Sequence, residues 1–188
     1  MFFDKPKPPA GPAEDLANLP VTEARPGDNL SVVGAGDEFA DLNFTVDHRN
    51  PYESGSRQWF EVTGMYRDRR VYLEIFPGDE VEVHAYTDPR RLTLDELGLS
   101  EDDLASMDER QNPADFFDFE NKFWLYRSSR EIGLFRDGRE PGTGFYCWQF
   151  QEQDGKRFLN IRKFENEGFT GLFSQVVNPG DVTIWRGK

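Results

Sequence analysis

Short runs of β-forming residues, separated by turn residues at close spacing, fill the chain from Asp28 onward. This pattern is typical of an antiparallel meander, because βαβ units would place longer helical segments between the strands. We expect about ten strands from it. The clearest runs cover residues 30–33, 42–47, 58–66, 70–76, 80–86, 122–126, 132–136, 144–151, 157–164, 169–177 and 182–185.

The tripeptide Pro-Gly-Asp occurs three times, at residues 26–28, 77–79 and 179–181, and alternating apolar residues follow each copy. Proline presets φ at the second position of a turn, and glycine supplies the positive φ that a type II turn needs next. Each copy is therefore predicted to be a turn that starts a strand. A phosphate or metal loop would need a helix N-terminus or clustered ligands after the turn, and the sequence has neither there.

One helix is expected in the middle of the chain, within residues 94–110. Ser100 and Asp103 have the spacing of a capping box, and Asn112-Pro113 ends the segment because the residue before proline is pushed out of the α region. Leu97, Leu104 and Met107 would face the sheet. The predicted fold class is mainly β: an antiparallel meander, in two packed β layers or a partly open barrel, with one short acidic helix inserted mid-chain.

The 188 residues suggest one domain preceded by an arm. Residues 1–26 hold six of the twelve prolines and are interpreted as a Pro-rich N-terminal arm, with residues 27–188 as a single β-rich domain. A weak internal similarity relates Trp59 and residues 70–75 to Trp148 and residues 157–161. It suggests a pair of β units, 27–92 and 120–188, joined by an acidic helical segment, 93–119.

Net charge, hydropathy and cysteine content limit the partners and the location expected for this chain. The net charge of −13 would repel nucleic-acid phosphates, and no apolar run is long enough to insert into a membrane. Cys147 is the single cysteine, so no internal disulfide can form, and the N-terminus lacks the apolar stretch of a secretory signal. A cytoplasmic location is expected.

Most of the acidity is local: residues 95–120 contain ten acidic residues and one basic residue. Phenylalanines alternate with the carboxylates there, which favours a docking surface for a protein partner with a basic, partly apolar surface. The alternative is a solvated helix face followed by a strand whose phenylalanines are core. The candidate partner-binding residues are Asp102, Asp103, Asp115, Phe116, Phe117 and Asp118.

A weak metal-like set consists of Glu80, Glu82 and His84, which a strand of period two would place on one face. The wet face of an amphipathic strand has the same pattern, so no metal or cofactor is assigned. The second histidine, His48, falls in a turn-like segment, residues 47–51.

No catalytic residues are assigned, because the nucleophile motif Gly-x-Ser-x-Gly is missing from the sequence. Cys147 is flanked by apolar residues on both strand faces, as expected of a buried, unreactive thiol. Glu61, next to Trp59, is a carboxylate whose pKa an aromatic neighbour could raise, although a cross-strand partner for it is the alternative.

The order of several landmarks resembles the DUF4178 family of bacterial proteins of unknown function. The landmarks are the first Pro-Gly-Asp, Trp59-Phe60-Glu61, residues 72–75, the Gly155 turn before residues 159–161, and residues 179–184. The resemblance covers roughly residues 28–185, and this chain has Val62 where the family pattern Trp-x-Glu-Tyr has tyrosine. It implies a β-rich cytoplasmic accessory protein associated with membrane-stress systems, and it brings no catalytic residues.

Together these features predict a non-enzymatic binding or adaptor protein whose acidic surface engages a basic protein partner. Two alternatives stay open. One is an immunity-type inhibitor of a basic toxin, and the other is a metal- or carboxylate-dependent hydrolase.

Overall fold

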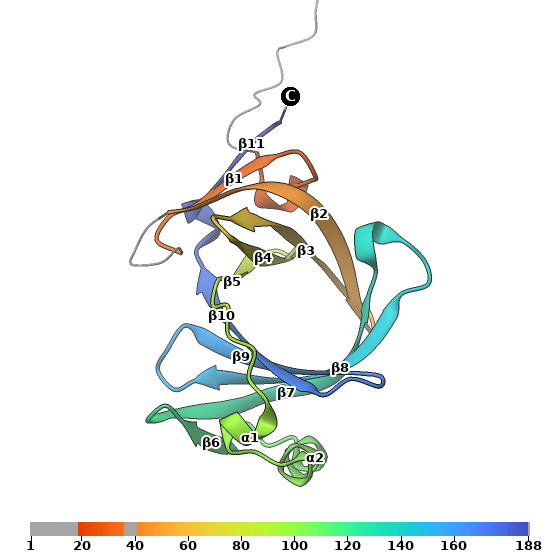
Figure 1. The fold of residues 1–188 in the computed structure, drawn as a ribbon, viewed down its shortest axis with the longest axis vertical. Helices are drawn as coiled ribbons and strands as arrows, with labels where there is room; N and C mark the ends of the chain where they lie inside the picture. The colour runs from red at the N-terminus through yellow and green to blue at the C-terminus, as the bar shows by residue number, and fades with distance from the viewer. Residues whose placement is uncertain (1–18, 36–40, 188) are drawn as a thin grey trace, which may run out of the picture.

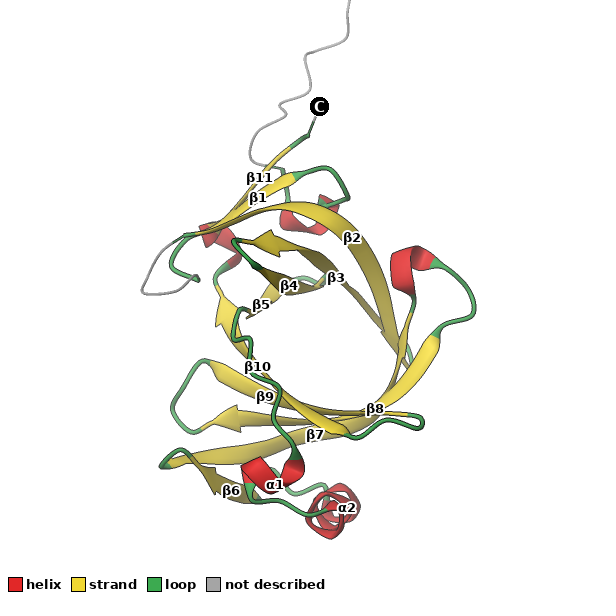
Figure 2. Cartoon of the chain, viewed as in Figure 1, coloured by secondary structure: helices red, strands yellow, loops and turns green. Residues whose placement is uncertain are grey.

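The computed structural model describes residues 19–35 and 41–187, and eleven strands in this part of the chain form one antiparallel sheet. The prediction of a mainly β, antiparallel fold with a helical insertion is confirmed (Figures 1 and 2). The strands are β1 Asn29–Val32, β2 Leu42–Ser54, β3 Arg57–Tyr66, β4 Arg69–Phe76, β5 Glu82–Tyr86, β6 Phe116–Phe119, β7 Lys122–Leu134, β8 Thr143–Glu152, β9 Arg157–Phe164, β10 Phe169–Val177 and β11 Val182–Trp185.

Eight of these strands form a ring in the order β2-β3-β4-β5-β10-β9-β8-β7. Strands β2 and β7 close it through a seam of two residue pairs, Tyr52 with Leu134 and Glu53 with Gly133. Of the two arrangements expected, the structure has the barrel-like one, closed at this seam. Strands β1 and β11 extend the sheet beyond β2, and β6 extends it beyond β7.

The ring consists of two four-stranded meanders, β2–β5 and β7–β10, which meet edge to edge at β5–β10 and at β2–β7. The helices lie between them in the sequence. Trp59 and Trp148 both occupy the second strand of their meander. An internal duplication stays a prediction.

The two larger apolar clusters lie on the outer face of the ring, and the inner face carries polar side chains together with a third, smaller apolar cluster. In β4, Val71, Leu73 and Ile75 are fully buried on the outer side, where they pack with residues of β1, β11 and the short 3-10 helix η1, Val21–Glu23. The alternate residues of β4, Arg70 and Tyr72 among them, line a cavity inside the ring. Period-two alternation in β4 therefore directs its polar side chains into the ring and its apolar side chains outward.

Helices cover the outer face of the second meander (Figure 1). The one predicted helix is in fact two, α1 Leu94–Leu97 and α2 Glu101–Arg110, because Gly98 adopts a left-handed conformation with φ of 69° that ends the first. The capping box of Ser100 and Asp103 is confirmed. The three helix residues expected to face the sheet, Leu97, Leu104 and Met107, are buried in this second apolar cluster.

Two strand predictions were wrong. Strand β2 continues through residues 47–51 to Ser54, with a bulge between Val46 and His48 instead of a turn. Residues 122–126 and 132–136, expected as two strands, belong to the one continuous strand β7. Residues 116–119 form the edge strand β6, which pairs with β7, as the alternative interpretation of that segment expected.

All three Pro-Gly-Asp copies precede a strand, as predicted. The expected positive φ occurs only at Gly27, where it is 92°. The third copy forms a 3-10 turn, Pro179–Asp181, in which the Asn178 side chain accepts a hydrogen bond from the Gly180 amide. The type II assignment was therefore wrong for the second and third copies.

The predicted N-terminal arm falls largely on residues 1–18, which lie outside the described residues. Its last part packs against the body of the protein, because Val21 and Ala24 are buried and the Leu19 amide donates to the Ile184 carbonyl at 3.4 Å. Among the described residues, no helix has the length and apolar character needed to cross a membrane.

Candidate functional site

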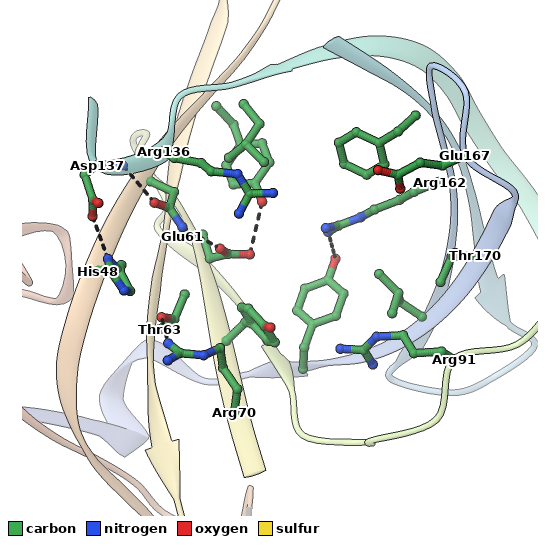
Figure 3. Close-up of a pocket in the computed structure, with 17 residues that line it drawn as sticks. His48, Glu61, Thr63, Arg70, Arg91, Arg136, Asp137, Arg162, Glu167 and Thr170 are labelled. Carbon is green, nitrogen blue, oxygen red and sulfur yellow. Dashed lines mark hydrogen bonds and ion pairs between the residues drawn. The ribbon is translucent and has the colours of Figure 1, made fainter. Parts of the chain in front are cut away.

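The interior of the ring holds a cavity of about 580 Å³ (Figure 3). Its wall is polar on β2 and β3, through Asn50, Tyr52, Glu61 and Thr63. Leu134, Phe164 and Leu172 give the wall contributed by the second meander an apolar strip. Side chains at one end, such as His48 and Arg136, are exposed, whereas Tyr52 and Glu61 are buried. The cavity is therefore a cup that opens at one end of the ring.

Four arginines from different elements line this cup: Arg70 of β4, Arg91, Arg136 and Arg162 of β9. Figure 3 shows the guanidinium groups of Arg91, Arg136 and Arg162 directed into the cavity, whereas that of Arg70 lies at the wall beside Thr63. Arg70 pairs with Asp47 at 2.7 Å and Arg162 pairs with Glu74 at 3.0 Å. Within residues 19–35 and 41–187, Arg91 and Arg136 have no carboxylate within ion-pair distance, so their charges face the opening without a counter-ion.

A buried triad of Glu74, Tyr86 and Arg162 closes the floor of the cup: Tyr86 and Arg162 line the cavity, and Glu74 lies behind them. The Tyr86 hydroxyl donates to Glu74 Oε2 at 2.8 Å, and Arg162 Nη2 donates to Glu74 Oε1 at 3.0 Å and to the Tyr86 oxygen at 3.3 Å. Burial raises the pKa of Tyr86 well above its usual value, and the charge of Glu74 raises it further. Arg162 Nε is buried without a hydrogen-bond partner.

A row of stacked rings lies across the first meander next to this floor. Trp59 stacks on Tyr52 and on Phe76, with ring centroids 5.5 Å apart in both pairs. His84 continues the row, 5.2 Å from Phe76 and 4.9 Å from Phe158. Broad rings on neighbouring strands fill the ring interior on this side, because aromatic pairs pack well at these distances.

Glu61 is a buried carboxylate in the wall of the cup, with 5% of its surface exposed. It accepts hydrogen bonds from Asn50 Nδ2 at 3.0 Å and from the Tyr52 hydroxyl at 3.1 Å. The alternative of a cross-strand partner is therefore confirmed, since Asn50 is paired with Glu61 in the register of β2 and β3. Burial raises the pKa of Glu61, and the charge of Glu74 adds to the effect while Arg162 opposes it.

A short 3-10 turn, η3 Arg136–Gly138, covers the edge of β2 beyond the seam. The Asp137 amide donates to Asn50 Oδ1 at 3.0 Å, and His48 Nδ1 lies 2.8 Å from Asp137 Oδ1. Asn50 thus links η3 to Glu61. The turn-like interpretation of the His48 segment was wrong, and the strand places His48 at the mouth of the cup.

The candidate metal residues do not form a three-ligand group. Glu82 Oε1 lies 2.5 Å from His84 Nε2, and Glu80 precedes β5. His84 is 2% exposed and points into the ring, whereas Glu80 and Glu82 are exposed, so the alternative of a solvent-exposed strand face holds for the two glutamates and fails for His84. No group of three histidine, cysteine or acidic side chains in the described part of the chain is arranged to hold a metal ion.

The six candidate partner-binding residues are not all available at the surface. Phe117 is buried, whereas Asp103 is exposed but caps α2, and Asp115 is half-buried and pairs with Arg110 at 2.8 Å. Asp102, Phe116 and Asp118 are exposed. Phe116 is 51% exposed and packs edge-on against Phe123 at 5.1 Å, which leaves a small aromatic patch at the edge of the sheet.

Cys147 is buried, as predicted, on the inner side of β8. Burial raises the pKa of its thiol to about 11. A thiol with this pKa holds little thiolate at neutral pH, which agrees with the expectation of low reactivity.

Sequence reasoning identified Glu61 but missed the arginines and Asn50 as its neighbours. Their signal is the alternation of Arg70, Tyr72 and Glu74 with fully apolar residues in β4. The same alternation is also typical of a strand with one solvent-exposed face. The polar face points inward here because the ring closes, and that closure joins strands that are distant in the sequence.

Comparison of the chain with protein-family models, with curated proteins and with solved structures gave no match. The resemblance to the DUF4178 family therefore stays a prediction, and function has to be argued from the cup itself.

Proposed function

We propose that this protein binds a small anionic molecule inside the ring. The observation that carries the proposal is the presence of four arginines around one cavity in a chain of net charge −13. Two of them, Arg91 and Arg136, have no carboxylate counter-ion among the described residues. Guanidinium groups bind carboxylates and phosphates through charge-assisted hydrogen bonds.

The size of the cavity supports a ligand larger than an inorganic ion. Pockets for small organic molecules have volumes of roughly 300–1,000 Å³ and combine apolar walls with a few polar groups. The cavity of about 580 Å³ has an apolar strip, formed by Leu134, Phe164 and Leu172, opposite the polar wall on β2 and β3. An organic anion with one apolar side could place its polar groups against the polar wall and its apolar side against the apolar strip.

The architecture adds a second argument. A polar ring interior costs stability, because buried polar and charged groups lose hydration that only good partners replace. The chain keeps the charged side chains of Glu61, Glu74 and Arg162 inside the ring, next to a small third apolar cluster, while its two larger apolar clusters lie outside. Proteins usually keep such destabilising buried polar groups only at functional sites.

Thermal-shift and calorimetric titrations with a panel of organic carboxylates and phosphate esters test this proposal. We expect stabilisation of the wild-type chain by some members, and at least a tenfold loss of affinity in the double variant Arg91→Gln/Arg136→Gln. The matched control is Arg25→Gln/Arg139→Gln, which removes two exposed arginines that do not line the cup. No stabilisation by any anion, or an equal loss in the control, would refute the proposal.

A second candidate function is protein binding at the aromatic patch of Phe116 and Phe123. Strand β6 ends the sheet order, so its outer edge has no strand partner among the described residues, and exposed sheet edges can pair with extended peptides. Asp118 is paired with Phe123 in the β6–β7 register, two residues after Phe116 on the same strand face, and its exposed carboxylate favours a basic peptide. Phe116 and Asp118 belong to the acidic docking surface expected from the sequence. An immunity-type inhibitor would use the same surface.

Pull-down with the Phe116→Ser/Asp118→Asn variant tests this second function against the cup variants. Partners lost with this variant but kept with Arg91→Gln/Arg136→Gln would support docking at β6, whereas partners kept with both would count against it.

The hydrolase alternative has less support, since Glu61 lies in the cup wall while His84 lies in the row of aromatic rings.

A further inference from the structure

Two buried carboxylates lie side by side in the cup, and only one has a cation. Glu61 and Glu74 are paired directly in the register of β3 and β4. Residues opposite each other in antiparallel strands have Cβ atoms about 5 Å apart, and like charges at such positions repel. Arg162 forms an ion pair with Glu74. Glu61 has neutral partners, Asn50 and Tyr52.

The charged groups around Glu61 come from every side of the cup. Arg162 of β9 and Glu74 of β4 lie at the floor. Toward the mouth lie His48 of β2, Arg70 of β4, Asp137 and Arg136 of η3, Arg91 and Glu167. Asp137 contacts His48 at 2.8 Å. Arg136 belongs to the pair of arginines at the opening that have no counter-ion in the described chain. Among the described residues, the cup thus has one buried carboxylate without an ion pair, Glu61, in its wall, and at its mouth the exposed Glu167, Arg91 and Arg136, which form no ion pair with one another or with other groups.

We infer that the ligand of the cup is zwitterionic, with an ammonium group that contacts Glu61 and an anionic group that contacts the arginines at the mouth. This inference rests on the proposed function and specifies its ligand class. A purely anionic ligand would balance the arginines but leave Glu61 buried next to Glu74 without a cation. A ligand ammonium would balance the second carboxylate and donate to the lone pairs that Asn50 and Tyr52 leave free.

The chemistry of Glu61 supports this assignment. Its pKa is raised in the empty cup because burial disfavours the carboxylate. An ammonium group next to it favours the carboxylate form and lowers that pKa again. Binding of a zwitterion in the window between the two pKa values should therefore release a proton from Glu61.

The test compares probes that differ only in the ammonium group. Three matched pairs vary the distance between the charges and the apolar bulk: phenylalanine with 3-phenylpropanoate, 6-aminohexanoate with hexanoate, and O-phosphoethanolamine with ethyl phosphate. We expect the ammonium-bearing member of at least one pair to bind at least tenfold more tightly to the wild-type chain. In Glu61→Gln, whose folding is checked by circular dichroism, this preference should fall to less than threefold while the deaminated member keeps its affinity.

Proton release gives an independent readout. Calorimetry of the preferred probe in two buffers of different ionisation enthalpy should show net proton release with the wild-type chain and none with Glu61→Gln.

The outcomes separate this inference from the proposed function. If the deaminated members bind as tightly as their partners and lose affinity in Arg91→Gln/Arg136→Gln, the cup takes simple anions and the inference of a zwitterion is wrong. If an ammonium preference persists unchanged in Glu61→Gln, Glu61 is not its contact and the inference is also wrong. If no member of any pair binds and no other organic anion does, both proposals fail.

Discussion

Glu61 and Glu74 face each other in register across β3 and β4, yet Arg162 pairs with Glu74 and leaves Glu61 to Asn50 and Tyr52. This asymmetry gives the two carboxylates different roles in stability. Replacement of each by glutamine should therefore have opposite effects.

Glu61→Gln should stabilise the protein at neutral pH. The pKa of Glu61 is raised by burial from its usual value of 4.5, so the folded state binds its proton more tightly than the unfolded chain does. The contribution of this group to stability then falls as the pH rises from about 4.5 through the raised pKa. Urea unfolding should show a gain of Glu61→Gln over wild type at pH 7.5 that disappears near pH 4.5. Glu165→Gln, an exposed charge removal, is the control, and a gain that does not depend on pH would contradict this prediction.

Glu74→Gln should destabilise the protein by about 3 kcal/mol, because it leaves the Arg162 guanidinium buried without a counter-ion. Side-chain exposure is 12% for Arg162 and 8% for Glu74. Asp47→Asn is the matched control: it breaks the pair with Arg70, whose side chains are 37% and 36% exposed, and should cost no more than about 1 kcal/mol. Chemical denaturation measures both losses, and equal values would mean that Arg162 is hydrated in the cup.

Gly64→Ala should destabilise the protein by about 1–3 kcal/mol, as expected for an overpacked site. A Cβ atom at Gly64 would lie 2.4 Å from the Thr45 carbonyl oxygen, next to the bulge of β2. Gly144→Ala in β8 is the control, because a Cβ atom there meets nothing within 4 Å. Thermal denaturation of both variants checks the prediction, which fails if Gly64→Ala is as stable as Gly144→Ala.

Cys147 should resist alkylation in the folded protein, because it is buried and its pKa is raised to about 11. Intact-mass measurement after treatment with iodoacetamide at pH 7.5 should show no adduct under native conditions and one adduct in 6 M guanidinium chloride. Rapid modification of the native chain would show that the ring interior opens frequently.

The sequence predicted the meander, because the alternation that creates strands is local. Residues 70–76 and 157–164 were recognised by their own side chains, and the Ser100 capping box by a spacing of three residues. Predictions failed where a distant strand decides the outcome. Strand β2 continues past Pro51 because β3 pairs with it along its length, which no local signal in residues 47–51 indicates.

The site was predicted only in part for the same reason. Glu61 was noticed beside Trp59, but the pairing of β2 with β3 brings Asn50 to it, and the closure of the ring brings Arg136 and Arg162. Charged residues on one face of a strand usually indicate solvent. Here they face a cavity, because β1, β11 and the two helices cover the apolar faces on the outside.

The pairing of β2 with β7 is the shortest strand ladder in the ring, and it lies next to the cup. The other seven joints of the ring are ladders of three or more residue pairs, whereas this one has two pairs, supported by the hydrogen bond from the Phe135 amide to the Pro51 carbonyl at 2.9 Å. Side chains reinforce this short ladder: Ser54 Oγ donates to the Glu131 carbonyl, and Tyr52 packs against Phe145 across the seam. Arg136 lies on one side of the seam and Glu61 on the other. A ligand that contacts both residues would bridge the two sides of the seam. Tighter binding would then stabilise the closed form of the ring.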